Sequence, residues 1–333
     1  GDRSGSERYL VNPIPVTFAG MGLGLPSRIV TNSDLAQSLD TSDDWITART
    51  GIQERRILDS DKALSDLAIE AASAALQDSG IAPEDIGLVI VATCTPDTFM
   101  PATACRVAAA VGCHNAGAFD LNIACSGFLY GLLTAISQME SQGIENVLLV
   151  GGDTLSRIIN WDDRRTAVLF GDSSGACVLR RQGKGALLGF DYGADGAAGS
   201  ALAIAAGPSA PSSRSEDYKV TMDGRSVFRF AANILVESSR RSLEKAGVSI
   251  SDVDLIIPHQ ANLRIIESAA KRWGSGLDRF FINLDKYGNT SAGSIPVALA
   301  EALDEGRVKA GSLILLAGFG GGLSWGSVLL RWG

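Results

Sequence analysis

Apolar and polar positions follow one another along the chain in the order expected for alternating strands and helices. An apolar run over 119–123 leads directly into an amphipathic pattern over 127–139, and a second apolar run over 254–258 precedes a helical pattern over 263–273. A further helical pattern, over 297–303, follows a polar, glycine-rich loop. Such alternation is typical of βαβ units with parallel strands, so the pattern predicts an α/β protein.

The same order of elements occurs twice. The segments that start at Leu76 and at Leu243 share Leu, Gly, Asp and Leu at equivalent positions and lie about half a chain length apart. Each predicts a helix, a stop at Gly80 or Gly247, a short turn and a buried strand. The repeat predicts two similar halves around one core, although helix, glycine and strand also recur by chance in α/β proteins.

No linker composition separates these halves. The stretch 183–215 is enriched in Gly, Ala, Pro and Ser. Its composition predicts a surface excursion between regular elements.

Three residues at the ends of predicted elements are candidates for catalysis. Cys125 stands where the first apolar run gives way to a helix, so the partial positive charge of the helix N-terminus is expected to lower the pKa of its thiol. The alternative is a buried cysteine that only packs. His259 follows the second apolar run and Asn289 lies in the glycine-rich loop. Ligands of open α/β sheets bind beyond the carboxyl ends of strands, so this grouping predicts acyl transfer through a thioester.

Composition narrows the alternatives. The 333 residues are 46% hydrophobic, which suits a large core, and the five cysteines form no CxxC pair and do not cluster with the two histidines. Neither zinc nor a disulfide framework is expected, and a reducing cytoplasm is the predicted location. No apolar run reaches the length of a membrane helix, and residues 1–6 lack the pattern of a secretion signal. The net charge of −8 argues against nucleic-acid binding.

Several short motifs spread along the chain resemble those of the β-ketoacyl-acyl-carrier-protein synthase III family, condensing enzymes of the thiolase superfamily. They lie at 40–46, 49–52, 124–128, 170–172, 259–264, 288–292 and 318–327. The resemblance extends from Val16 to the C-terminus. It implies a five-layered αβαβα fold, in which an N-terminal extension, 1–15, precedes a half that carries the nucleophile, 16–180, and a half that carries His and Asn, 181–333.

The resemblance also implies a reaction. An acyl-CoA primer, expected to be acetyl-CoA, acylates Cys125, and malonyl-acyl carrier protein then loses CO₂ while His259 and Asn289 donate hydrogen bonds to its thioester oxygen. Backbone N–H groups of Cys125 and Gly321 are expected to form the oxyanion hole. No metal and no cofactor beyond the coenzyme A thioester substrate is implied. The loop 318–322 contains no second cysteine, which favours synthesis over thiolysis. His114 is interpreted as a solvated loop residue.

Binding contacts follow from the same motifs. The residues expected to bind coenzyme A are Thr41, Trp45, Arg49, Arg164 and Asn262, with Trp45 and Arg164 sandwiching the adenine. Docking of an acidic acyl carrier protein is expected at Arg229, Arg264, Lys271 and Arg272, although a solvated helix face explains such charges equally. Met100 is expected to close the acyl pocket across a homodimer interface, where its thioether would admit longer primers.

Two alternatives to this function stay open at the level of sequence. The first is a specialised acyltransferase that uses another acceptor, such as an amine or an alcohol. The second is a non-catalytic partner subunit that only binds acyl chains.

Overall fold

The computed structural model describes residues 12–333, so most of the predicted extension lies outside the described residues. Two five-stranded sheets form the framework. The first has the strand order β2 (Thr17–Gly24), β8 (Asp172–Arg180), β7 (Asn146–Thr154), β5 (Leu88–Ala92), β6 (Gly117–Leu121). The second has the order β1 (Ile14–Pro15), β9 (Ala186–Ala194), β14 (Ser324–Arg331), β13 (Leu313–Gly320), β12 (Leu255–Pro258). Both sheets are mixed: β5 runs parallel to β6 and β7, β12 runs parallel to β13, and the other pairs are antiparallel.

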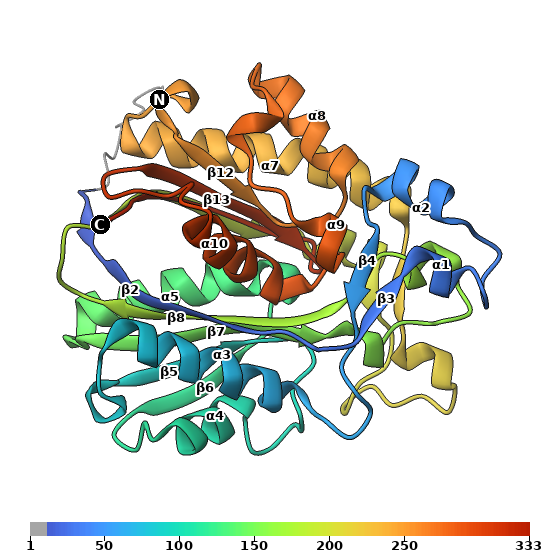
Figure 1. Ribbon diagram of the computed structural model, residues 1–333, viewed down its shortest axis with the longest axis horizontal. Helices are drawn as coiled ribbons and strands as arrows, with labels where there is room; N and C mark the ends of the chain where they lie inside the picture. The colour runs from blue at the N-terminus through green and yellow to red at the C-terminus, as the bar shows by residue number, and fades with distance from the viewer. Residues whose placement is uncertain (1–11) are drawn as a thin grey trace, which may run out of the picture.

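Helices fill the space between the sheets and cover their outer faces (Figure 1). The central layer consists of α5 (Gly127–Gln142) and α10 (Ser294–Asp304). The outer layers are α3 (Leu64–Ser79) with α4 (Thr103–Val111) on the first sheet, and α7 (Gly224–Ala246) with α8 (Leu263–Trp273) on the second. Leu129 of α5 and Leu299 of α10 join one buried cluster with strand residues of both sheets. The predicted five-layered αβαβα arrangement is confirmed.

The internal repeat is visible in the backbone. Helices α3 and α7 both end at a left-handed glycine, Gly80 with φ 64° and Gly247 with φ 67°. Each glycine N–H donates to the carbonyl of the leucine four residues earlier, Leu76 or Leu243, and a 3₁₀ turn (η1, Pro83–Asp85, or η6, Ile250–Asp252) then leads into β5 or β12. Glycine adopts this conformation without a Cβ clash, which explains why it stands at both stops.

The prediction of a surface excursion over 183–215 was wrong for its first part. Residues 186–194 form β9, which pairs along its length with β14 and also holds β1. A Cβ at Gly189 would come within 2.2 Å of the Ser242 carbonyl oxygen, so the small residues serve the close approach of α7. The next part forms η4 (Gly196–Ala201) and β10 (Leu202–Ile204), which pairs with β11 (Val220–Met222). Residues 205–214 form a largely exposed loop, as predicted.

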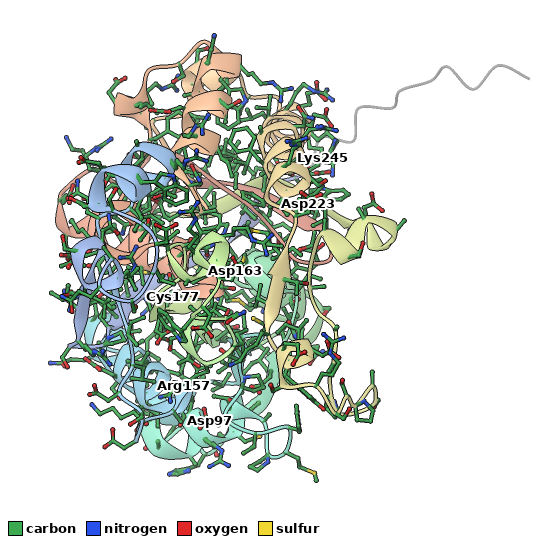
Figure 2. The ribbon with its side chains drawn as sticks, turned by 90° about the vertical axis from the view of Figure 1, so that its right-hand side faces the viewer. Asp97, Arg157, Asp163, Cys177, Asp223 and Lys245 are labelled. Atoms are coloured by element: carbon green, nitrogen blue, oxygen red, sulfur yellow. The ribbon has the colours of Figure 1, made fainter. Side chains whose placement is uncertain are left out.

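Short elements gather at one end of the sheets (Figure 1). They are β3 (Ile29–Thr31), β4 (Glu54–Arg56), α1 (Asn32–Leu35), α2 (Asp43–Thr50), α6 (Arg164–Ala167) and α9 (Leu284–Tyr287). Figure 2 faces this end, where Asp163 caps α6 and Asp223 caps α7 and both line one surface hollow. Among residues 12–333, no helix has the length and apolarity needed to cross a bilayer.

Candidate active site

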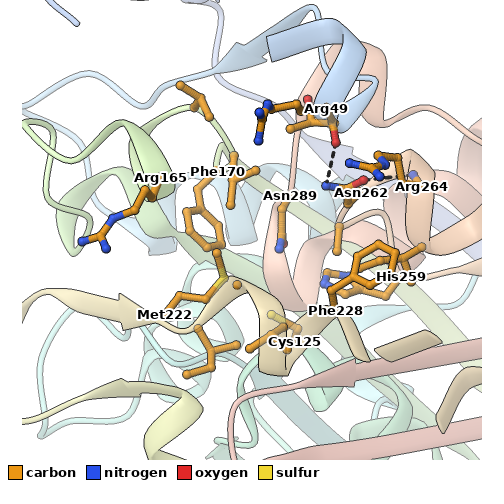
Figure 3. A pocket seen from close by; sticks show the side chains of 18 of the residues that line it. Arg49, Cys125, Arg165, Phe170, Met222, Phe228, His259, Asn262, Arg264 and Asn289 are labelled. Atoms are coloured by element: carbon orange, nitrogen blue, oxygen red, sulfur yellow. Dashed lines mark hydrogen bonds between the residues drawn. The ribbon is translucent and has the colours of Figure 1, made fainter. Parts of the chain in front are cut away.

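A cavity of about 480 Å³ opens at the end of the sheets where the short elements gather. Cys125, His259 and Asn289 all line it, so the structure brings the three sequence-predicted side chains together (Figure 3). Cys125 comes from the first half of the chain and the other two from the second. Apolar side chains complete the wall: Val168, Leu169, Phe170, Leu202, Met222, Val227, Phe228, Ile265 and Phe319.

Cys125 lies in a 3₁₀ turn, η2 (Ala124–Ser126), that runs into α5. The preceding Ala124 has φ 47°, a left-handed conformation that a residue with a Cβ rarely adopts, and such strain is common where a side chain must be aimed. The end of β13 passes so close that a Cβ at Gly320 would lie 2.7 Å from the Cys125 backbone nitrogen. Glycine at 320 therefore lets the second half of the chain approach the thiol.

The expected lowering of the Cys125 pKa was wrong for the free protein. Burial raises the pKa of this thiol to about 12; the nearby Ser291 hydroxyl opposes the shift, and the nearby charge of Asp153 adds to it. Cys125 is only 8% exposed. Removal from water outweighs the partial charge of the helix terminus, because desolvation penalises a thiolate more strongly than about half a unit charge stabilises it.

This pKa predicts how the free thiol reacts with iodoacetamide. The alkylation rate of Cys125 should rise about tenfold per pH unit between about pH 7 and 10 without levelling off, because the thiolate fraction grows throughout this range. The rate is measured on the Cys125 peptide by mass spectrometry, since Cys105 is an exposed free thiol that also reacts. A plateau below pH 8 would show that the helix terminus dominates after all.

His259 follows β12 and is 1% exposed. Its Nδ1 lies 2.7 Å from Ser294 Oγ, and its ring meets Phe319 edge-on at 5.3 Å. Its Nε2 is buried and has no hydrogen-bond partner among residues 12–333. Burial lowers the pKa of His259 to about 3. The ring is therefore neutral at physiological pH and acts as a hydrogen-bonding group rather than as a charge.

Asn289 is held by its own backbone and by the next turn. Its Oδ1 accepts a hydrogen bond from the N–H of Ser291 at 2.9 Å, which leaves the amide nitrogen on the side of Cys125 (Figure 3). Its N–H donates to Leu169 and its carbonyl accepts from Gly171, so the two halves of the chain meet at this residue. The side-chain NH₂ of Asn289 is therefore an uncharged donor, and the hydrogen bond to Ser291 fixes its direction.

Sequence reasoning missed the group beneath Cys125. Asp153 is fully buried at the end of β7, and its carboxylate accepts from Thr93 Oγ at 2.7 Å and from the N–H groups of Cys94 and Ala292 at 2.8 and 3.2 Å. Burial raises the pKa of the Cys94 thiol, with added contributions from Asp153 and Cys125. An acid three residues after the apolar run 147–150 was the only sequence signal for this arrangement.

Four of the five expected coenzyme A contacts line the cavity. Trp45 lines the cavity, and two guanidinium groups contact its ring, Arg49 at 4.7 Å and Arg164 at 5.0 Å from the ring centre. Arg164 therefore contacts the Trp45 ring directly, with no space between the two for the adenine of the predicted sandwich. Asn262 caps α8 through the N–H of Arg264 and donates to the Arg49 carbonyl, so both ends of its amide are engaged. Thr41 does not line the cavity.

The remaining expected residues lie outside the cavity, with the exception of Arg264. Arg272 donates to the Ala232 carbonyl and to Asn233 Oδ1, which joins α8 to α7. Arg229 and Lys271 are exposed on these helices, and Met100 is 86% exposed in the loop after β5. Gly321 is next to the lining residue Gly320, and its carbonyl accepts from Ser324 Oγ at 2.9 Å. His114 lies exposed in a loop.

Comparisons with known proteins agree with this architecture. The family model described as 3-oxoacyl-(acyl-carrier-protein) synthase III matches residues 119–196, and the model of its C-terminal part matches residues 243–332. A protein of Bacillus anthracis named beta-ketoacyl-acyl-carrier-protein synthase III 1 is 48% identical over 320 residues, which cover 96% of this chain and 99% of that protein. A protein of Caldanaerobacter subterraneus named beta-ketoacyl-acyl-carrier-protein synthase III is 49% identical over 325 residues, 96% of this chain and 98% of that protein.

Solved structures give the same result. The 3-oxoacyl-acyl-carrier-protein synthase III of Aquifex aeolicus superposes with a TM-score of 0.90 at 44% identity, over 95% of this chain and all of that one. A priming β-ketosynthase from the R1128 polyketide biosynthetic pathway superposes with a TM-score of 0.90 at 33% identity, over 96% of this chain and 97% of that one. With identities near one half over nearly the whole length, the chain belongs to the β-ketoacyl-acyl-carrier-protein synthase III family.

Proposed function

We propose that this enzyme condenses an acyl-CoA primer, expected to be acetyl-CoA, with malonyl-acyl carrier protein and so initiates fatty-acid synthesis. The observation that supports this most directly is the lining of one cavity by Cys125, neutral His259 and Asn289. A nucleophile that forms a covalent intermediate and two neutral donors are what a decarboxylative condensation requires.

In the first half-reaction, the sulfur of Cys125 attacks the acyl carbonyl carbon and the bond to the coenzyme A sulfur breaks. The proton of the thiol leaves with coenzyme A, so the raised pKa of Cys125 does not prevent a balanced exchange of one thioester for another. The oxygen of the tetrahedral intermediate carries the negative charge. We assign the N–H groups of Cys125 and Gly321 to this oxygen, which is supported by the close packing of Gly320 on Cys125.

In the second half-reaction, the malonyl thioester loses CO₂ and the electron pair of the broken bond forms an enolate. His259 Nε2–H and Asn289 Nδ2–H donate to the enolate oxygen. No base is needed, because departure of CO₂ generates the carbanion. The carbanion then attacks the acyl-Cys125 carbonyl, the thiolate leaves, and the product is a β-ketoacyl thioester on the carrier protein.

Intact-protein mass spectrometry tests this order. Acetyl-CoA should add one acetyl group to the wild-type protein, and malonyl-acyl carrier protein should discharge it as a β-ketoacyl carrier protein. The same experiment tests the alternative of an acyltransferase that uses another acceptor. An acetyl adduct that malonyl-carrier protein leaves untouched would favour that candidate, and the absence of any adduct would overturn both.

Trp45 is proposed to stack on the adenine of coenzyme A. Trp45→Ala is expected to raise the KM for acetyl-CoA about tenfold or more with a smaller effect on kcat, because one aromatic stacking contact to a base contributes about 1–3 kcal/mol. Steady-state kinetics provide the measurement. Trp161→Ala is the matched control, since Trp161 is 37% exposed outside this cavity. An unchanged KM in Trp45→Ala would contradict the stacking contact.

Arg229, Arg264 and Lys271 are proposed to receive the acidic carrier protein. All three are exposed on α7 and α8, and Arg264 lines the cavity, so a carrier bound there would present its acyl group to the opening. Charges of this kind chiefly raise the association rate. The bonds that Arg272 makes to α7 support a mainly structural role for it.

A homodimer is proposed on the side of the molecule where β6 and β9 lie. Helix α5 packs on β5 and β7 of the first sheet and on β14 of the second, so the open edge of β6 and the outer strands β9 and β1 lie on the same side. A groove of about 320 Å³ there is lined by Tyr130, Leu133, Phe190 and Tyr192. An open strand edge beside apolar side chains favours pairing with a second copy.

Two large apolar side chains, Phe99 and Met100, are 81% and 86% exposed in the loop after β5. Met100 is proposed to close the acyl pocket of the partner chain. Light scattering, which measures the mass of the particle in solution, tests the dimer. Met100→Asp should shift the wild-type dimer toward monomer and lower activity with octanoyl-CoA as primer, while Ile29→Asp, at a 45% exposed site on β3, should do neither. A wild-type monomer would rule the interface out.

A further inference from the structure

Ser294, the first residue of α10, lies against the Nδ1 side of the His259 ring. Its Oγ is 2.7 Å from His259 Nδ1 and 3.0 Å from the backbone nitrogen of Gln260. Both Ser294 and His259 are buried, at 2% and 1% exposure. Each N–H and O–H group on this side of the ring must therefore find its hydrogen-bond acceptor within the protein rather than in solvent.

Only one assignment of donors and acceptors gives each of Ser294 Oγ, His259 Nδ1 and the Gln260 N–H a hydrogen-bond partner. The backbone N–H of Gln260 only donates, so it occupies a lone pair of Ser294 Oγ. The hydroxyl proton of Ser294 then needs an acceptor, and among residues 12–333 the acceptor within hydrogen-bond distance is His259 Nδ1. A neutral imidazole that accepts at Nδ1 carries its proton at Nε2. The opposite tautomer would leave the buried hydroxyl proton without a partner, which disfavours it by about tenfold or more.

The other ring nitrogen faces the cavity. Nε2 is buried and has no protein partner among the described residues, while His259 lines the cavity together with Cys125 and Asn289 (Figure 3). Asn289 is oriented in the same way, because its oxygen is taken by the Ser291 N–H and its nitrogen is left on the cavity side. Two donors thus converge on one place, and each is aimed by a residue of the 291–294 turn.

We infer that Ser294 is a positioning residue, whose hydroxyl holds His259 in the tautomer that donates from Nε2 to the substrate oxygen. This inference rests on the proposed function, which gives that donor its task during loss of CO₂. The capture of the primer by Cys125 does not use the donor. Loss of the Ser294 hydroxyl therefore slows condensation more than it slows acylation of Cys125.

The tautomer is measured directly by ¹⁵N NMR of the histidine side chains in the full-length protein. The chain has only two histidines, and His114→Gln assigns the signals. In the wild type, His259 should show a protonated Nε2 and an unprotonated Nδ1 around neutral pH. In Ser294→Ala the Nδ1-protonated tautomer should appear, while Ser294→Thr, which keeps the hydroxyl, should retain the wild-type spectrum.

Activity is measured on the same variants in two stages. Ser294→Ala should condense acetyl and malonyl groups about tenfold more slowly, with acetylation of Cys125 within about twofold of wild type, and Ser294→Thr should stay near wild type. Ser238→Ala is the matched control, because Ser238 is a buried serine bonded to Ser327 on the far side of the second sheet.

A wild-type His259 protonated at Nδ1 would overturn the inference, and so would a Ser294→Ala protein whose tautomer or condensation rate is unchanged. If Ser294→Ala fails to fold, the spectra of the wild type and of Ser294→Thr still show whether His259 is protonated at Nε2 or at Nδ1. The spectrum needs no substrate. An enzyme that does not condense malonyl groups would therefore overturn the proposed function and leave the tautomer result standing.

Discussion

Cys125→Ser is expected to lower the condensation rate by about 10³-fold or more and to abolish the acetyl adduct. A serine hydroxyl in this buried site has no base to activate it, because the donor nitrogen of His259 already carries a proton. The adduct is read by intact-protein mass spectrometry and the rate by formation of β-ketoacyl carrier protein.

Cys94→Ser is the matched control for this variant. Cys94 lies close enough to Cys125 and Asp153 for both to perturb its thiol. A protein without the Cys94 thiol should still form the adduct. If Cys94→Ser loses the adduct and Cys125→Ser keeps it, the nucleophile has been assigned to the wrong cysteine.

His259→Ala and Asn289→Ala are each expected to lower the condensation rate by about 10²–10³-fold, the usual effect of removing one donor from a developing oxyanion. Acetylation of Cys125 should survive in both, since the donors serve the malonyl thioester. The acetyl-enzyme should therefore accumulate when malonyl-carrier protein is added.

Stopped mixtures analysed by mass spectrometry separate the two half-reactions. Asn289→Asp adds a sharper comparison, because a carboxylate of the same shape repels the enolate instead of donating to it. A variant that loses acylation and condensation equally would show that these residues also act on Cys125, contrary to the division of roles proposed here.

Much of the fold could be predicted from local pattern. The helices expected over 127–139, 263–273 and 297–303 are α5, α8 and α10, and the repeat at Gly80 and Gly247 ends two helices in the same way. Periodicity succeeds for α5 and α8 because each has an apolar side and ends at a left-handed glycine, Gly143 or Gly274. Helix α10 is apolar on nearly all sides, which matches its burial, and its C-terminal cap is Glu305. Strand β9 was missed, because it contains no β-branched residue and carries glycines, of which Gly189 makes room for α7.

The candidate site also combines features that the sequence predicts with features that depend on tertiary packing. The types and order of Cys125, His259 and Asn289 are readable from motifs, and the structure brings all three to one cavity. The sign of the Cys125 pKa shift could not be predicted from sequence, because it depends on burial by segments far away in the chain, among them the end of β13. Arg164 stacking on Trp45 is likewise a contact between distant segments.

The alternating elements, the doubled architecture, the family and the chemical types of the reacting groups follow from the amino-acid sequence, because they depend on residue identity and on neighbours within a few turns. The tertiary structure decided the protonation of those groups. Burial keeps Cys125 as a thiol and His259 neutral, and Ser294 lies against Nδ1 only because α10 packs beside the end of β12. Desolvation and hydrogen-bond partners are properties of three-dimensional surroundings, which no local stretch of sequence contains.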